Sequence, residues 1–88
     1  MKKYIIKKHC EATERCTVAL GRVQDYYYGN SDRFLSRDFL PSEETTRICG
    51  YDSEVAAQER MKAIQKSAEL EQSSGYWAIT TEIISVEV

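Results

Sequence analysis

The segment from Asp52 to Gly75 constrains the fold most, because it carries a long helical pattern. Its apolar side chains recur with the period of an α-helix and form one narrow stripe, Ala57, Met61, Ile64 and Ala68. Asp52 or Ser53 can cap the first turn, and Gly75 can stop the helix. Small residues dominate the stripe, which Ala56, Ala63 and Leu70 widen to one side. The pattern predicts a helix of about residues 53–73 that lies close to a sheet.

The first part of the chain alternates as a half-buried strand does. Over residues 3–10, one face carries Tyr4, Ile6 and Cys10, with Lys8 interrupting it, and residues 16–22 repeat the alternation. A hairpin centred on Thr13 would pair Cys10 with Cys16, His9 with Thr17 and Ile6 with Leu20, and would put the apolar partners on one face. The rival interpretation is a helix over residues 16–27. Gly21 and the β-branched residues of that segment disfavour a helix, so we prefer the hairpin.

The middle of the chain mixes short elements with turn residues. The expected order is a strand at 26–28, a turn at 29–32, a return strand at 33–35, a break at Pro41, one helical turn capped by Ser42, and a short strand at 45–49 that ends at Gly50.

Residues 76–88 are rich in strand-forming side chains. Their alternation changes phase, because Trp77, Ile79 and Ile83 have odd numbers whereas Ile84, Val86 and Val88 have even ones. Two interpretations follow: a β-bulge or bend near 82–84, or a strand that is apolar on both faces because something covers it, such as a second copy of the chain.

These patterns together predict one α+β domain over residues 1–88. We expect a small antiparallel sheet of three or four strands, with the helix of about 53–73 packed on one face, in the order β-β-(irregular or β)-α-β. This layout is similar to that of many very short proteins from bacterial, phage and mobile-element genomes, including some anti-CRISPR inhibitors. No family motif is present, so the similarity assigns a role to no residue.

Charge and cysteine content narrow the function classes. The formal net charge is -2, with +3 over residues 1–39 and -5 over residues 40–88, which argues against a phosphate-backbone binder. The N-terminal segment lacks the apolar run of an export signal, and no stretch is apolar enough to cross a membrane. We therefore expect a cytoplasmic protein whose three cysteines, Cys10, Cys16 and Cys49, are reduced.

The candidates for catalysis and metal binding are weak. His9 and Cys10 are neighbours, and neighbouring side chains of a strand point to opposite faces, so they cannot act as a nucleophile and its base. The spacing of Cys10 and Cys16 is not that of a zinc knuckle. The carboxylate pairs lie in exposed segments, and the glycines form no phosphate loop. We expect no enzyme activity, catalytic residue, metal or cofactor.

The best positive feature is a tyrosine- and arginine-rich segment over residues 22–39. Consecutive tyrosines in a strand cannot all face the core, and tyrosine and arginine are enriched at the centres of protein interfaces. The candidate partner-binding residues are Arg22, Tyr26, Tyr27, Tyr28, Arg33, Phe34 and Arg37.

Three hypotheses follow. The first is a small interaction module that binds an unidentified protein and acts by steric occlusion, for example as an inhibitor from a phage or mobile element. The second is a nucleic-acid accessory module that contacts phosphates through Arg22, Arg33 and Arg37. The third is a homodimer formed through the C-terminal strand.

Overall fold

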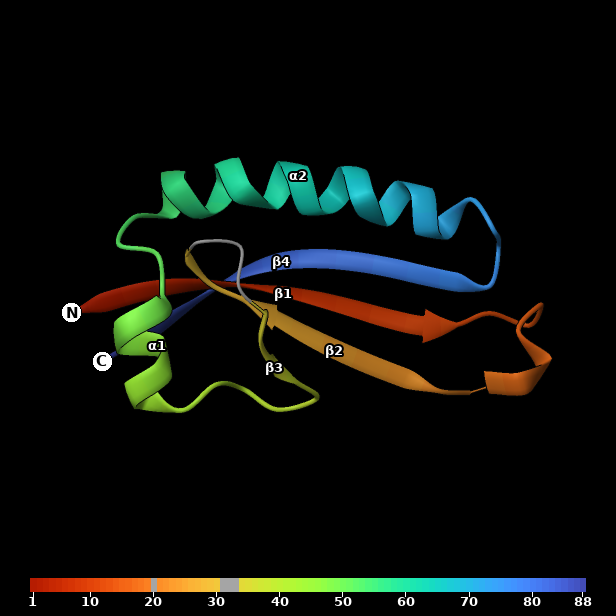
Figure 1. Ribbon diagram of the computed structural model, residues 1–88, viewed down its shortest axis with the longest axis horizontal. Helices are drawn as coiled ribbons and strands as arrows, with labels where there is room; N and C mark the ends of the chain where they lie inside the picture. Colours follow the sequence, from red (N-terminus) through yellow and green to blue (C-terminus); the bar gives the residue numbers. More distant parts are fainter. Residues whose placement is uncertain (20, 31–33) are drawn as a thin grey trace.

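The computed structural model describes residues 1–19, 21–30 and 34–88. Within them the elements are β1 (Lys2–Ala12), η1 (Thr17–Ala19), β2 (Val23–Tyr28), β3 (Phe34–Arg37), α1 (Glu43–Cys49), α2 (Glu54–Gln72) and β4 (Trp77–Glu87). The described strands form one antiparallel sheet in the order β3-β2-β1-β4. The long helix α2 runs along β4 and β1 (Figure 1). The predicted α+β fold, with one long helix on a small antiparallel sheet, is therefore confirmed.

The helix α2 forms where its caps and its apolar stripe predict it. The Ser53 side chain accepts a hydrogen bond from the Ala56 backbone N–H at 3.2 Å, which makes Ser53 the N-cap. The stripe packs on the sheet: Ala57, Ile64 and Ala68 are buried and Met61 is partly buried. The expected widening of the stripe is wrong, since Ala56, Ala63 and Leu70 are exposed. A single helix on one sheet buries only the narrow stripe that faces it.

The predicted hairpin has the wrong register. Cys10 lies opposite Gln24 rather than Cys16, and His9 lies opposite Asp25 rather than Thr17. β1 continues to Ala12 because β4 pairs with it along that whole length, so the chain turns later than Thr13. Residues 17–19 form a 3-10 turn, and β2 begins only at Val23, which also rules out the rival helix over 16–27. Leu20, the expected partner of Ile6, lies outside the described residues.

Residues 43–49 form a two-turn helix where a single turn and a short strand were expected. Ser42 caps it as predicted, accepting from the Thr45 backbone N–H at 3.2 Å, and the Thr46 hydroxyl donates to the Ser42 carbonyl at 2.9 Å. Two glutamates in the first turn stabilise the helix through their interaction with the positive end of its dipole. The strand predicted at 45–49 is therefore wrong, while the predicted end at Gly50 is confirmed.

Both faces of the sheet are covered near the start of β1. Ile5 and Ile6 point to opposite faces, and neither is exposed to solvent. Ile6 packs in a core cluster with the α2 residues Ala57 and Ile64. On the Ile5 side, α1 contacts β1, and Gly50 lies so close to the Lys3 side chain that a Cβ at Gly50 would stand 2.8 Å from the Lys3 Cβ. The two helices thus lie on opposite faces of the sheet.

The C-terminal strand β4 has no bulge over its described length. Its register with β1 is uninterrupted from Trp77 to Glu87, so the predicted bulge near 82–84 is wrong. Ile79 and Ile83 pack on the α2 side, whereas Ile84 lies opposite Ile5 and faces the other side. The change of phase in the sequence therefore marks a strand with apolar residues on both faces. In the described part of the chain, no helix has the length and hydropathy needed to span a membrane.

Candidate interaction surface

β2 distributes the three tyrosines between the two faces of the sheet. Tyr26 lies opposite Lys8 and Tyr28 lies opposite Ile6, so both share the face on which α2 packs. Both are partly buried at the border of the core. Tyr27 points to the other face, and only 7% of it is exposed, which leaves little of its surface for a partner.

Gln24, two positions before Tyr26, joins three polar side chains on this face. The amide orientation that satisfies every neighbour lets its nitrogen donate to the Tyr26 hydroxyl at 2.7 Å. Its oxygen then accepts from the Arg22 Nε at 3.0 Å and from the Arg37 guanidinium at 2.5 Å. Gln24 itself is buried. One amide in β2 therefore holds two guanidinium groups beside a tyrosine, and one of them comes from β3.

Aromatic contacts extend this arrangement along β3. The Phe34 ring lies 5.9 Å from the Tyr26 ring and 6.3 Å from the Tyr28 ring, measured between centroids, in tilted and edge-on geometries. The Arg37 guanidinium lies 5.8 Å from the centre of the Tyr26 ring. Phe34 remains 53% exposed although it touches both tyrosines. We call the group of Arg22, Gln24, Tyr26, Phe34 and Arg37 the Arg–aromatic surface.

Lys8 borders the Arg–aromatic surface on the α2 side. Its ammonium lies 5.1 Å from the centre of the Tyr26 ring and 3.2 Å from Glu71 Oε1 of α2. Burial on its own lowers the pKa of Lys8, but the nearby Tyr28 hydroxyl and the hydrogen bond to Glu71 outweigh burial and raise this pKa. Lys8 is therefore charged and lies between α2 and the sheet.

The local charge is only weakly positive. Lys8, Arg22 and Arg37 bring three positive charges, and Glu71 and Asp38 bring two negative ones, which leaves +1. Asp38 Oδ2 lies 3.5 Å from the Arg37 Nε, so that charge is partly neutralised. Among the described residues, no carboxylate lies within ion-pair distance of Arg22. Of these three described cations, Arg22 is thus the most available to a ligand.

The structure brings most of the predicted partner-binding residues together. Arg22, Tyr26, Phe34 and Arg37 meet in the Arg–aromatic surface, and Tyr28 touches its edge through Phe34. Tyr27 lies on the other face, and Arg33 lies outside the described residues. Sequence reasoning missed Gln24 and Lys8. The available signal was that a polar residue at each position interrupts a face that is otherwise aromatic or apolar.

A second polar cluster surrounds His9 on the opposite face. His9 Nδ1 lies 2.6 Å from Asp25 Oδ1, and His9 Nε2 lies 2.9 Å from Glu11 Oε1. The hydrogen bonds to Glu11 and to Asp25 raise the pKa of His9. Cys10 packs instead against Ala68 of α2, and burial raises the pKa of its thiol, so His9 and Cys10 are separated as predicted. Over the described residues, no group of three or more His, Cys, Asp and Glu side chains is arranged to hold a metal ion.

Comparison with known proteins gave no relative. The chain matches no protein-family model, and none of the curated proteins or solved structures compared with it matched either.

Proposed function

We propose that this chain is a small, non-enzymatic interaction protein whose Arg–aromatic surface binds an acidic segment of a partner protein. The observation that carries the proposal is the Gln24 amide, which fixes Arg22 and Arg37 beside the Tyr26 ring. A cationic group held in place before binding loses little conformational entropy when it binds a carboxylate. Tyrosine and arginine are also the side chains that dominate the energetics of protein interfaces.

Charge favours an acidic protein segment over a nucleic acid. A nucleic-acid strand carries one negative charge per nucleotide and needs a row of cations. Counted over the described residues, the surface together with its charged neighbours Lys8, Asp38 and Glu71 has a net charge of +1, and the whole chain has a net charge of -2. One or two carboxylates beside an apolar side chain would match Arg22, Arg37 and the half-exposed Phe34 ring. Binding of this kind needs no cofactor and would act by covering the partner's own binding surface.

We also propose that the protein acts in the cytoplasm. Cys10, Cys16 and Cys49 are all free thiols. Thiols persist in reducing compartments, whereas small exported domains are commonly stabilised by disulfides.

A binding assay with matched variants tests the proposed function. The probe is a panel of fluorescently labelled peptides that combine Asp or Glu with apolar residues, and binding is measured by anisotropy. Arg22→Ala and Phe34→Ala should each weaken binding about tenfold or more, because each removes a central contact. Arg47→Ala and Leu70→Ala change exposed side chains outside this surface and should leave affinity unchanged.

Two outcomes would contradict this proposal. The first is that no acidic peptide binds, or that the control variants weaken binding as much as the surface variants do. The second is that an oligothymidylate binds better than any peptide and that its affinity falls steeply with salt, which would favour the nucleic-acid hypothesis.

A further inference from the structure

The two edges of the sheet differ in how well they are protected. Edge strands expose unpaired backbone groups, and proteins usually shorten, kink or charge such strands with lysine. The β3 edge is short, its pairing with β2 shifts register at Tyr27/Tyr28, and Asp38, which follows its last residue, has a φ of 65°. The β4 edge, described along its full length Trp77–Glu87, has no proline, no lysine and no register shift. β4 is therefore open to pairing with another strand.

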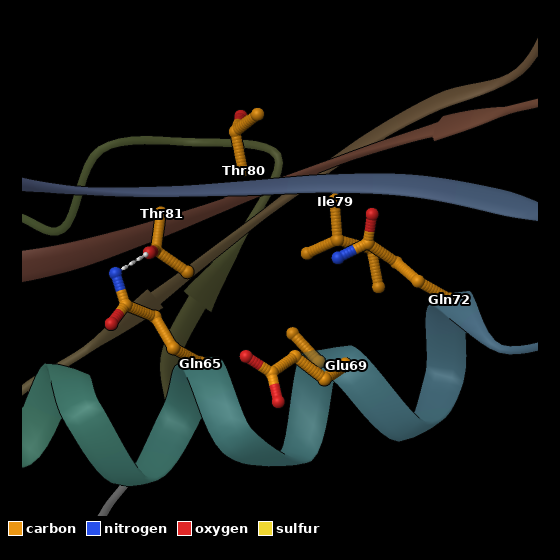
Figure 2. Close-up of a pocket in the computed structure, with 7 residues that line it drawn as sticks. Gln65, Glu69, Gln72, Ile79, Thr80 and Thr81 are labelled. Carbon is orange, nitrogen blue, oxygen red and sulfur yellow. Dashed lines mark hydrogen bonds between the residues drawn. The ribbon is translucent and has the colours of Figure 1, made fainter.

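An open groove runs between β4 and one flank of α2. Its volume is about 490 Å³, and it is lined by Gln65, Ala68, Glu69, Gln72, Ile79, Thr80 and Thr81. Figure 2 shows Gln65 and Thr81 pointing toward each other, and the Gln65 amide donates to the Thr81 hydroxyl at 3.0 Å. Glu71, on the other flank of α2, reaches Lys8 of β1. The flank that carries Gln65 therefore faces the outer edge of β4.

This flank of α2 is self-complementary in charge. Residues spaced four and three apart share one side of a helix, and this side carries Gln58, Lys62, Gln65, Glu69 and Gln72. All five are exposed. If a second copy of the helix lies antiparallel and the two cross at Gln65, Lys62 faces Glu69 of the second copy, and Glu69 faces its Lys62. Gln58 and Gln72 then face each other at both ends.

The strand edge fits the same two-fold axis. Thr81 lies beside Gln65, to which it is hydrogen-bonded. If β4 pairs antiparallel with β4 of the second copy, so that the two Thr81 residues face each other, the strands and the helices share one two-fold axis. Ile79 then faces Ile83 of the second copy on the α2 side, and Thr80 faces its Glu82 on the other side. No carboxylate faces another carboxylate in this register. Adjacent strands lie about 4.8 Å apart. An α2 helix placed over β1 and β4 of each copy would therefore lie roughly 8–10 Å from α2 of the other copy, which is a normal distance between packed helices.

We propose that two copies of this chain associate through β4, in antiparallel register about Thr81, with the Lys62–Glu69 flanks of α2 facing each other. The two sheets would become one continuous sheet with both α2 helices on the same face. The interface leaves the Arg–aromatic surface free, because that surface lies on β2 and β3, toward the opposite edge of the sheet. This proposal does not depend on the proposed function.

Charge exchange on α2 tests the helix contact. Sedimentation equilibrium from about 1 µM to about 1 mM should show a monomer converting to a dimer. Glu69→Lys should weaken the dimer about tenfold, since it places two lysines opposite each other in both symmetric contacts. The double variant Lys62→Glu/Glu69→Lys should restore the original dissociation constant. Glu59→Lys, on the outward face of α2, is the matched control and should change little.

Hydrogen exchange tests the strand contact. Amides of β4 should exchange more slowly as the protein concentration rises, whereas amides of β3 should not change. A monomer at all concentrations would overturn the proposal. So would a dimer that Glu69→Lys leaves unchanged, or one in which β4 amides gain no protection, because the contact would then lie elsewhere.

Discussion

Gln24 occupies a β2 position that faces the core side of the sheet, where alternation would favour an apolar side chain. A buried amide is costly unless its polar groups find partners. Here the Tyr26 hydroxyl accepts from the amide nitrogen, and Arg22 and Arg37 both donate to the amide oxygen. Gln24 therefore holds Arg22 over the sheet, and it holds Arg37 there together with the Tyr26 ring and Asp38.

His9 gives a residue-scale prediction about pH. Its carboxylate neighbours, Glu11 and Asp25, raise its pKa above the ordinary value of about 6.5. Because folding raises this pKa, protonated His9 stabilises the folded state. The stabilisation is complete below the unfolded-state pKa of about 6.5. This contribution is lost as the pH rises through the folded-state pKa. We therefore expect the free energy of unfolding of the wild type to exceed that of His9→Ala most near pH 6, with the difference shrinking toward pH 8.5.

Two measurements check the His9 prediction. His9 is the chain's single histidine, so its ring signals can be titrated by NMR without ambiguity. Urea unfolding, followed by Trp77 fluorescence at several pH values, gives the stability difference. A folded-state pKa of His9 at or below about 6.5 would show that Glu11 and Asp25 do not stabilise the protonated ring. A wild-type minus His9→Ala difference in unfolding free energy that does not vary with pH would show the same.

At the scale of elements, the Lys8–Glu71 pair links α2 to the sheet. The Lys8 side chain is only 11% exposed, whereas the Glu71 side chain is 46% exposed. Removing the carboxylate leaves a nearly buried ammonium without its partner, while removing the ammonium leaves a carboxylate that water can solvate. The two halves of the pair should therefore respond differently to substitution.

We expect Glu71→Gln to cost about 1–2 kcal/mol of unfolding free energy, and Lys8→Met to change it by less than about 1 kcal/mol. Urea unfolding at neutral pH measures both values. Glu43→Gln, which breaks the exposed i,i+4 pair with Arg47, is the control and should cost at most about 0.5 kcal/mol. A larger loss from Lys8→Met than from Glu71→Gln would contradict this account of the pair.

The elements differ in how well they could be predicted from the sequence. The α2 helix was predictable because its stripe, its Ser53 cap and its Gly75 stop agree. Residues 45–49 misled because Thr45, Thr46 and Ile48 are β-branched, although the Ser42 cap and the glutamates that follow it outweigh their strand preference. Alternation over 16–22 also misled, because it predicted a strand there, whereas residues 17–19 form a 3-10 turn in which Val18 is 99% exposed.

The candidate surface was predictable in its composition but not in its arrangement. Tyrosine and arginine at 22–37 indicated an interface, and the chain does gather Arg22, Tyr26 and Arg37. Their meeting depends on β2 starting at Val23 and on the pairing of β2 with β3, which places Arg37 opposite Tyr26. Both depend on pairing between distant residues, which a local pattern does not encode.

In the whole molecule, the two halves of opposite charge occupy different parts of the fold. The basic half, residues 1–39, forms β1, β2 and β3, and the acidic half forms α1, α2 and β4. The Arg–aromatic surface thus belongs to the basic side of the sheet, while the proposed contact between copies belongs to the acidic side, where Lys62 and Glu69 balance each other. One chain could use the two surfaces at the same time.

Chemical-shift mapping on the intact, isotope-labelled chain tests whether the Arg–aromatic surface binds an acidic segment. An acidic peptide from the binding panel is titrated into the protein, and the backbone and side-chain amide signals are followed. We expect the largest shifts on the Gln24 side-chain amide and on the backbone of residues 22–26 and 34–37. Largest shifts confined to α1 or to the His9 face, with the Gln24 amide unmoved, would contradict it.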